Sequence, residues 1–130
     1  MISYPLTLKD VANVDVVFDS IIVSGTSTVS VDAASSDVEP RKLKISHSIE
    51  GKSATTRNAH LISLEKVKVD SQGVPQLLTV NLTVKKPRSS VFSATDAADL
   101  LRMLFDFLTT GTAPTVDTTG SLAQILRGES

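Results

Sequence analysis

The clearest hydrophobic pattern in the chain is a strict alternation over residues 41–50. After Arg41 the odd positions are apolar apart from one histidine, and they are Leu43, Ile45, His47 and Ile49. The even positions are polar, and they are Lys42, Lys44, Ser46 and Ser48. A period of two is typical of a β-strand with one buried face and one face in water. The pattern therefore predicts a half-buried strand over these ten residues.

Two further strands are predicted directly after this one. Residues 60–69 are rich in apolar positions, but both of their faces are mixed and the pattern does not say which face is buried. After a compact turn at residues 70–75, residues 76–86 alternate again. One side of this third strand is apolar and holds Leu78, Val80, Leu82 and Val84. The other side is polar and holds Thr79, Asn81, Thr83 and Lys85. Adjacent antiparallel strands of this kind form a sheet with one wet face and one dry face.

Shorter apolar runs precede these strands. Leu6 and Leu8 alternate with polar residues, and residues 14–24 form a Val- and Ile-rich run that Gly25 ends. We expect a strand at each, with a bulge in the second near residues 19–20. Residues 28–31 predict one more short strand, and residues 33–40 form a polar loop that ends at Pro40.

The period changes to a helical one after Pro87. Ser93 and Asp96 resemble a capping box at the start of a helix. Apolar residues then follow helical spacing at Ala97, Leu100, Leu101, Leu104, Phe105 and Leu108. Because Met103 and Phe107 widen this surface further, the helix needs more than one partner surface. We expect one to be its own sheet and the other to belong to a second subunit.

A second, short amphipathic helix is predicted at residues 121–127. Its inward positions are Leu122, Ile125 and Leu126, and Gly128 is placed as the C′ residue. Strands first and helices last predict an α+β fold. The length of 130 residues suits a single domain.

The charge of the chain is unevenly distributed. Residues 41–88 hold ten basic and three acidic residues, a net charge of +7, whereas the rest of the chain has a net charge of −8. The overall charge of −1 hides this contrast. A basic centre between acidic ends points to a polyanionic partner for that part of the chain.

Candidate catalytic chemistry is weak. The chain has no cysteine, and its two histidines, His47 and His60, have no carboxylate pair nearby in the sequence. No nucleotide-binding or hydrolase motif occurs. We expect no catalytic residues, no metal site and no cofactor, and His47 is interpreted as a packed or interface histidine. No apolar run is long enough to span a bilayer, and the first residues do not resemble a signal peptide.

The polar row of residues 42–48 is more informative. A solvated strand face explains it equally well when it is taken alone, but the second polar row at residues 79–85 favours a function. Lysine supplies salt-dependent attraction to phosphate, and short hydroxyl and amide side chains bond to bases or sugars. No aromatic side chain is available on these rows for stacking.

With these residues in view, the chain resembles the coat proteins of small single-stranded RNA bacteriophages. The matching text is RKLKISHS at residues 41–48, RNAHLISL at residues 57–64, LTVNLTV running into KKPR at residues 78–88, and SLAQILRGES at residues 121–130. The order of elements carries the resemblance: an N-terminal hairpin at residues 1–31, a central sheet at residues 41–88 and a helical dimerisation region at residues 93–130.

The resemblance implies that two subunits join edge to edge and that the helices of each cross onto the other. The implied dimer interface comprises Leu100, Leu101, Leu104, Phe105, Leu108, Leu122, Ile125 and Leu126. Dimers would assemble in the bacterial host cytoplasm into an icosahedral virion shell around single-stranded RNA, without a membrane. Leu77 lies near a position where some members stack a base on tyrosine, and the family also represses translation by binding an RNA hairpin.

The implied RNA-binding residues lie on the polar sheet face. They are Lys42, Lys44, Ser46, Ser48, Lys66, Thr79, Asn81, Thr83 and Lys85. Two alternatives stay open at this point. One is a dimeric RNA-binding regulator that forms no shell, and the other is a small enzyme or ligand-binding domain that uses His47 or His60.

Overall fold

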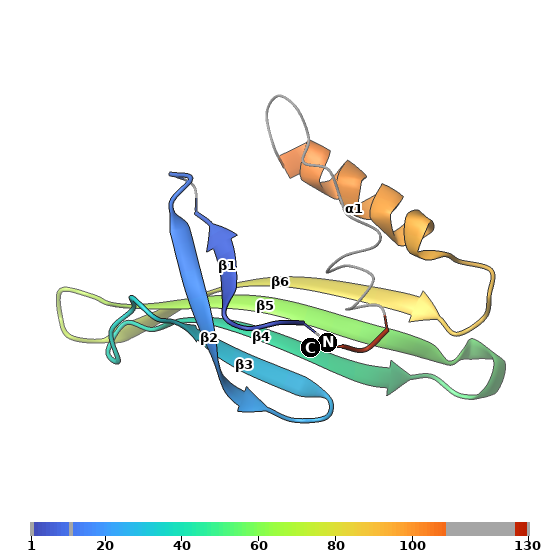
Figure 1. Cartoon of the computed structure of the whole chain (residues 1–130), viewed down its shortest axis with the longest axis horizontal. Coiled ribbons are helices and arrows are strands. Elements are labelled where there is room, and N and C mark those ends of the chain that lie inside the picture. The colour runs from blue at the N-terminus through green and yellow to red at the C-terminus, as the bar shows by residue number, and fades with distance from the viewer. Residues whose placement is uncertain (1, 11, 109–126, 130) are drawn as a thin grey trace. The chain divides into compact units, whose positions relative to one another are not determined.

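The structure is a computed structural model that describes residues 2–10, 12–108 and 127–129. Within these residues, six strands form one antiparallel sheet in which each strand pairs with the next along the chain (Figure 1). The strands are β1 (Leu6–Lys9), β2 (Asp15–Val23), β3 (Ser27–Asp32), β4 (Arg41–Glu50), β5 (Arg57–Val69) and β6 (Pro75–Pro87). A 3-10 turn, η1 (Ser53–Thr55), precedes β5, and helix α1 (Ala94–Leu108) follows β6. The predicted α+β order is confirmed, with the N-terminal hairpin forming part of the same sheet.

The chain divides into two compact units. The first, which we call the sheet unit, comprises Ser3–His47 and Leu61–Thr83. The second, which we call the helix unit, comprises Met1–Ile2, Ser48–His60 and Val84–Ser130. β4, β5 and β6 each contribute residues to both units, and each unit is described by itself below.

The core of the sheet unit lies on one face of β1–β4. Residues that lie opposite each other on neighbouring strands share a face, and Phe18 of β2 lies opposite both Leu6 and Asp32. Phe18 is only 2% exposed, and Leu43 and Ile45 of β4 are buried on the same face. Burial of these side chains supplies most of the hydrophobic stabilisation of the unit.

The predicted bulge in β2 is confirmed to within a residue. The register between β2 and β3 shifts between Ser20 and Ile22. β1 pairs with β2 only up to Phe18, so the last part of β2 has a neighbour on one side alone. The apolar residues there, Ile21 to Val23, are exposed.

The dry face predicted for β4 is correct for its first half only. Leu43 and Ile45 are buried, His47 is half-buried and Ile49 is 63% exposed. The prediction that Ile49 belongs to the dry face is therefore wrong for the single chain. The reason is that β3 pairs with β4 only as far as Ser46, so no strand lies beside Ile49 on that side.

β5 begins at Arg57, three residues before the predicted start. Its buried residues are Ala59, His60 and Ser63, which do not follow a single alternation. The mixed faces in the sequence thus correspond to a mixed burial pattern in the structure.

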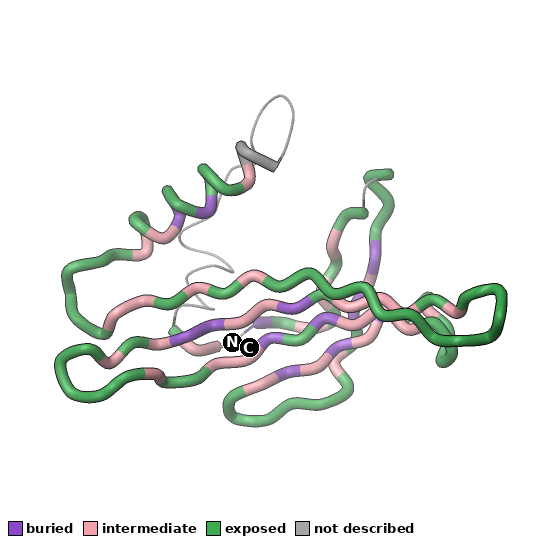
Figure 2. The backbone as a smooth tube through the Cα atoms, turned by 180° about the vertical axis from the view of Figure 1, so that it is seen from behind, coloured by how far each residue is buried: buried purple, intermediate pink, exposed green. Residues whose placement is uncertain are grey.

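β6 has the predicted alternation, but the single chain does not bury its apolar side. Every residue from Pro75 to Asn81 is exposed (Figure 2), including Leu78 at 65% and Val80 at 62%. Leu82 and Val84 are half-buried. β6 is an edge strand that pairs only with β5, so nothing beside it covers these side chains.

In the helix unit, the predicted capping box is confirmed. The Ser93 hydroxyl accepts the Asp96 backbone N–H at 3.3 Å, and Asp96 Oδ2 accepts the Ser93 backbone N–H at 2.7 Å. These bonds satisfy backbone donors at the helix start.

Among the side chains of α1 whose burial the structure describes, the buried ones form a narrow stripe. Ala98 and Leu101 are buried, whereas Leu100, Met103 and Leu104 are exposed. Gly128 has a φ of 85°, in the left-handed region that favours glycine. The second helix predicted at residues 121–127 lies almost entirely outside the described residues, including its inward positions Leu122, Ile125 and Leu126.

Candidate nucleic-acid interface

The first polar row lies on β4, on the face opposite Leu43 and Ile45. In the sheet unit, Lys44 and Lys42 lie opposite Val29 and Val31 of β3. Lys44 is exposed and Lys42 is half-buried. Within the part of the chain that the structure describes, neither ammonium group has an ion-pair partner, so both charges are available to an anion. Ser46 continues the row opposite Ser27.

The second polar row lies on β6. Thr79, Asn81 and Thr83 are all exposed in the sheet unit. Because β5 separates β4 from β6, two residues of these rows on one face would lie roughly 10 Å apart.

The helix unit contains a triad of charges around Glu50. Lys85 donates to Glu50 Oε2 at 2.9 Å, and Arg57 approaches the same oxygen at 3.2 Å. The hydrogen bond from Lys85, with the charge of both cations, holds the pKa of Glu50 below its ordinary value. Lys85, predicted as an RNA contact, is therefore paired to an acid in the structure. The fourth residue of the β4 row, Ser48, is exposed in this unit.

Lys66 of β5, also predicted as an RNA contact, lines a pocket together with Asp32 and Arg41. By the strand register, Asp32 shares the face of Phe18, and Arg41 shares the face of Leu43. Lys42 and Lys44 lie on the other face. The structure thus associates Lys66 with a different set of side chains from the β4 row.

The sequence reasoning missed both the Glu50 triad and the pocket. Their members lie far apart in the sequence, with 35 residues between Glu50 and Lys85. The three charges of the triad lie at the end of β4, at the start of β5 and near the end of β6, and only the pairing of strands brings them together.

No group of three or more histidine or acidic residues that could hold a metal ion occurs in the described ranges. Burial lowers the pKa of His47 below its ordinary value, which favours the neutral ring near pH 7. His60 is almost fully buried. No helix in the described part of the chain is long and apolar enough to cross a membrane.

No family model matches the sequence, and no curated protein matches it. Solved structures do match. The coat protein of bacteriophage EMS014 is similar with a TM-score of 0.59 and 18% identity, over 90% of this chain and 81% of that chain. The virus-like particle of bacteriophage AVE015 gives a TM-score of 0.56 and 10% identity, over 80% and 73% of the two chains.

A third structure, the virus-like particle of bacteriophage AVE019, gives a TM-score of 0.52 and 14% identity, over 79% of this chain and 83% of that chain. Identities this low establish a shared fold rather than a shared activity. The chain has the fold of these bacteriophage coat-protein and virus-like-particle structures.

Proposed function

We propose that this protein is the structural coat protein of a single-stranded RNA bacteriophage. It forms homodimers that assemble into an icosahedral shell, and the polar sheet face binds RNA on the inside. The single observation that carries the proposal is β6, a 13-residue edge strand on which the apolar side chains of Leu77, Leu78 and Val80 are exposed in the isolated chain.

An exposed, long and apolar edge strand pairs readily with another chain. A second copy of β6, running antiparallel to the first, would cover Leu78 and Val80 and satisfy the unpaired backbone groups of both copies. Such a contact is two-fold symmetric, because each copy offers the same surface. The proposed dimer therefore contains one continuous sheet of twelve strands made from the six described in each chain.

Helix α1 supports the same dimer. Leu100, Met103 and Leu104 lie on the part of the helix that is exposed in the isolated chain. Burying one such side chain contributes about 1.5–3 kcal/mol. We assign these residues, with the half-buried Phe105, to a surface that the helices of two copies share. Leu101, predicted for the same surface, is already buried inside the single chain.

RNA binding is assigned to the two polar rows of the sheet unit. Lys42 and Lys44 would attract phosphates, and short side chains would contact sugars and bases. These short side chains are Ser46, Thr79, Asn81 and Thr83. Ser48 and Lys85 extend the rows into the helix unit, where Glu50 offsets the charge of Lys85.

Electron microscopy of the purified protein tests the shell. Discrete particles of uniform diameter are expected, and a preparation that contains only dimers would contradict the shell and favour an RNA-binding regulator. For the RNA surface, Lys42→Ala with Lys44→Ala should lower the amount of co-purified RNA while dimers persist. Lys52→Ala with Lys68→Ala is the matched control, since it removes the same charge from exposed positions outside the rows.

A further inference from the structure

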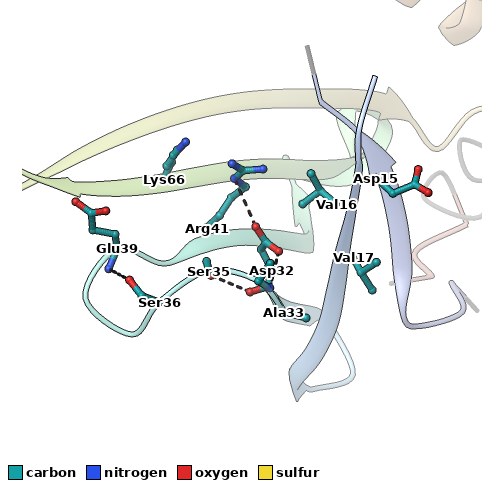
Figure 3. A pocket seen from close by; sticks show the side chains of 11 residues that line it. Asp15, Val16, Val17, Asp32, Ala33, Ser35, Ser36, Glu39, Arg41 and Lys66 are labelled. Carbon is teal, nitrogen blue, oxygen red and sulfur yellow. Dashed lines mark hydrogen bonds and ion pairs between the residues drawn. The ribbon is translucent and has the colours of Figure 1, made fainter. Parts of the chain in front are cut away.

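A pocket of about 730 Å³ lies within the sheet unit (Figure 3). Its lining includes Asp32 from the end of β3, Arg41 from the start of β4 and Lys66 from β5. Ser36 and Glu39 of the β3–β4 loop form another part of its wall. These side chains are separated in the sequence by up to 34 residues (Asp32 to Lys66), and the pairing of strands brings them together.

The two cations of this pocket have unused hydrogen-bond donors. Arg41 Nε lies 3.8 Å from Asp32 Oδ2, which is an ion pair but is too long for a hydrogen bond. Among the described residues, neither the Arg41 guanidinium nor the Lys66 ammonium has a hydrogen-bond acceptor. Two cationic groups with free donors in one pocket form a receptor for an oxyanion.

Three acids line the pocket, and each is already engaged. Asp15 forms an ion pair with Lys9. Asp32 Oδ1 accepts the Ala34 backbone N–H at 3.0 Å, and Glu39 Oε1 accepts the Val69 backbone N–H at 2.9 Å. Their negative charge remains nearby and disfavours a ligand with several charges. The pocket therefore suits one singly charged oxyanion, which Arg41 and Lys66 would hold from two sides.

The strand register argues for a protein carboxylate over an RNA phosphate. Asp32 and Arg41 share the face of Phe18 and Leu43, whereas the proposed RNA rows begin with Lys42 on the other face. Outside residues 41–88 the chain carries a net charge of −8, so every copy offers many carboxylates to a neighbour.

We propose that this pocket receives an Asp or Glu carboxylate from a neighbouring copy of the chain, bound between Arg41 and Lys66. This contact rests on the proposed function, because it forms only if copies of the chain assemble into a shell. The site is a contact between copies that is separate from β6 and α1.

High-resolution cryo-electron microscopy of the assembled protein tests the proposal directly. A carboxylate oxygen of another copy is expected within about 3.5 Å of a nitrogen of Arg41 or Lys66. An RNA phosphate at that position, or a pocket that holds only solvent, would overturn the proposal while leaving the shell intact.

A variant provides a second test. Lys66→Gln removes a donor that has no partner inside the described chain, so the fold should persist. The protein concentration needed for half-assembly should rise about tenfold, the equivalent of one modest charge-assisted contact. The control is Lys68→Gln, which changes an exposed lysine of the same strand outside the pocket. This control should alter the concentration for half-assembly by less than about twofold. Equal effects of the two variants would refute the pocket contact.

If the unmodified protein forms no shell, the proposed function fails separately. The pocket is then tested in the soluble protein by titration with N-acetylglutamate α-amide, a carboxylate probe. A saturable change in the chemical shift of the Arg41 Nε–H supports carboxylate binding if the Lys66→Gln variant shows a weaker change. The absence of any saturable change overturns the proposed carboxylate site.

Discussion

Asp10 and Asp70 close two hairpins of the sheet unit with the same set of hydrogen bonds. In each hairpin, the aspartate Oδ1 accepts the backbone N–H groups of the residues two and four positions later, at 2.9 and 3.0 Å for Asp10 and at 2.9 Å twice for Asp70. The residue three positions later has a positive φ in both, Asn13 at 61° and Gly73 at 81°. Its backbone N–H donates to the aspartate carbonyl at 3.0 Å in each case. The β1–β2 and β5–β6 connections are therefore the same turn.

Acid should loosen the β5–β6 turn. The backbone N–H groups of Val74 and Gln72 lower the pKa of Asp70 below its ordinary value. A carboxylate with a lowered pKa in the folded state stabilises the fold fully above its unfolded-state pKa of about 4, and this stabilisation is lost as the pH falls through the lowered value. Asp70→Asn keeps the Oδ1 acceptor but not the charge. The midpoint temperature of thermal unfolding should fall less between pH 6 and pH 3 for the variant than for the unmodified protein. Parallel curves of midpoint temperature against pH for the two proteins would contradict the role of Asp70.

Gly73 and Gly25 provide a matched pair for the backbone of the same turn. A Cβ built at either position meets nothing within 4 Å, but only Gly73 has a positive φ. Gly73→Ala should therefore destabilise the protein by about 1 kcal/mol through backbone strain alone. Gly25→Ala should be neutral or slightly stabilising. Urea denaturation measures both, and a loss of the same size at Gly25 would exclude strain as the cause.

Glu50→Gln should strengthen non-specific RNA binding. In the structure Glu50 pairs with Lys85 and Arg57, so its neutralisation frees two cations at the end of the sheet. The slope of log affinity against log salt concentration should steepen by about 0.7 for each cation that gains a phosphate. Binding of a short oligouridine at several salt concentrations measures the slope. The control Glu65→Gln removes the same charge from β5, outside the triad, and an equal steepening of the slope in this variant would show a general charge effect.

Ser93→Ala should shorten or destabilise α1. It removes the hydroxyl that accepts the Asp96 N–H, and loss of such a cap costs about 1 kcal/mol. Ser93→Thr keeps a hydroxyl at the cap and should recover most of this stability. Circular dichroism at 222 nm during urea unfolding measures the effect, and identical curves for the two variants would argue against the cap.

Local features of this chain could be predicted from the sequence, and features that depend on strand pairing could not. Ser93 and Asp96 lie three residues apart, so their capping box is readable directly. Leu43 and Leu78 lie in equally clear alternating patterns, yet one is buried and the other exposed. The difference is that β4 has a strand on each side, whereas β6 is at the edge.

The candidate site divides in the same way. The polar row on β4 was predicted from alternation alone, and its lysines do lie on the face opposite the core. Two other contacts could be predicted only with the register of β5 and its neighbours. They are the salt bridge between Lys85 and Glu50 and the grouping of Lys66 with Arg41. Mixed apolar positions on both faces of β5 left that register undetermined, and no single-strand pattern could have supplied it.

Leu78→Lys with Val80→Lys should separate the proposed dimer without unfolding the chain. Both side chains are exposed in the isolated chain, so the substitutions remove no packing inside it. In the dimer, each copy would place two like charges beside two from the other copy, and lysine is a residue that natural edge strands use to prevent pairing. Sedimentation at micromolar concentration should show a monomer, and the far-ultraviolet circular dichroism spectrum should be unchanged.

Gln76→Lys with Thr79→Lys is the control for added charge, because it changes polar residues of the same exposed stretch and keeps Leu78 and Val80. Because charge placed near the edge also repels, this control should weaken the dimer less than the double change at Leu78 and Val80. If the Leu78 and Val80 variant still forms a stable dimer, the dimer interface lies elsewhere, and the proposed pairing of β6 with β6 is contradicted.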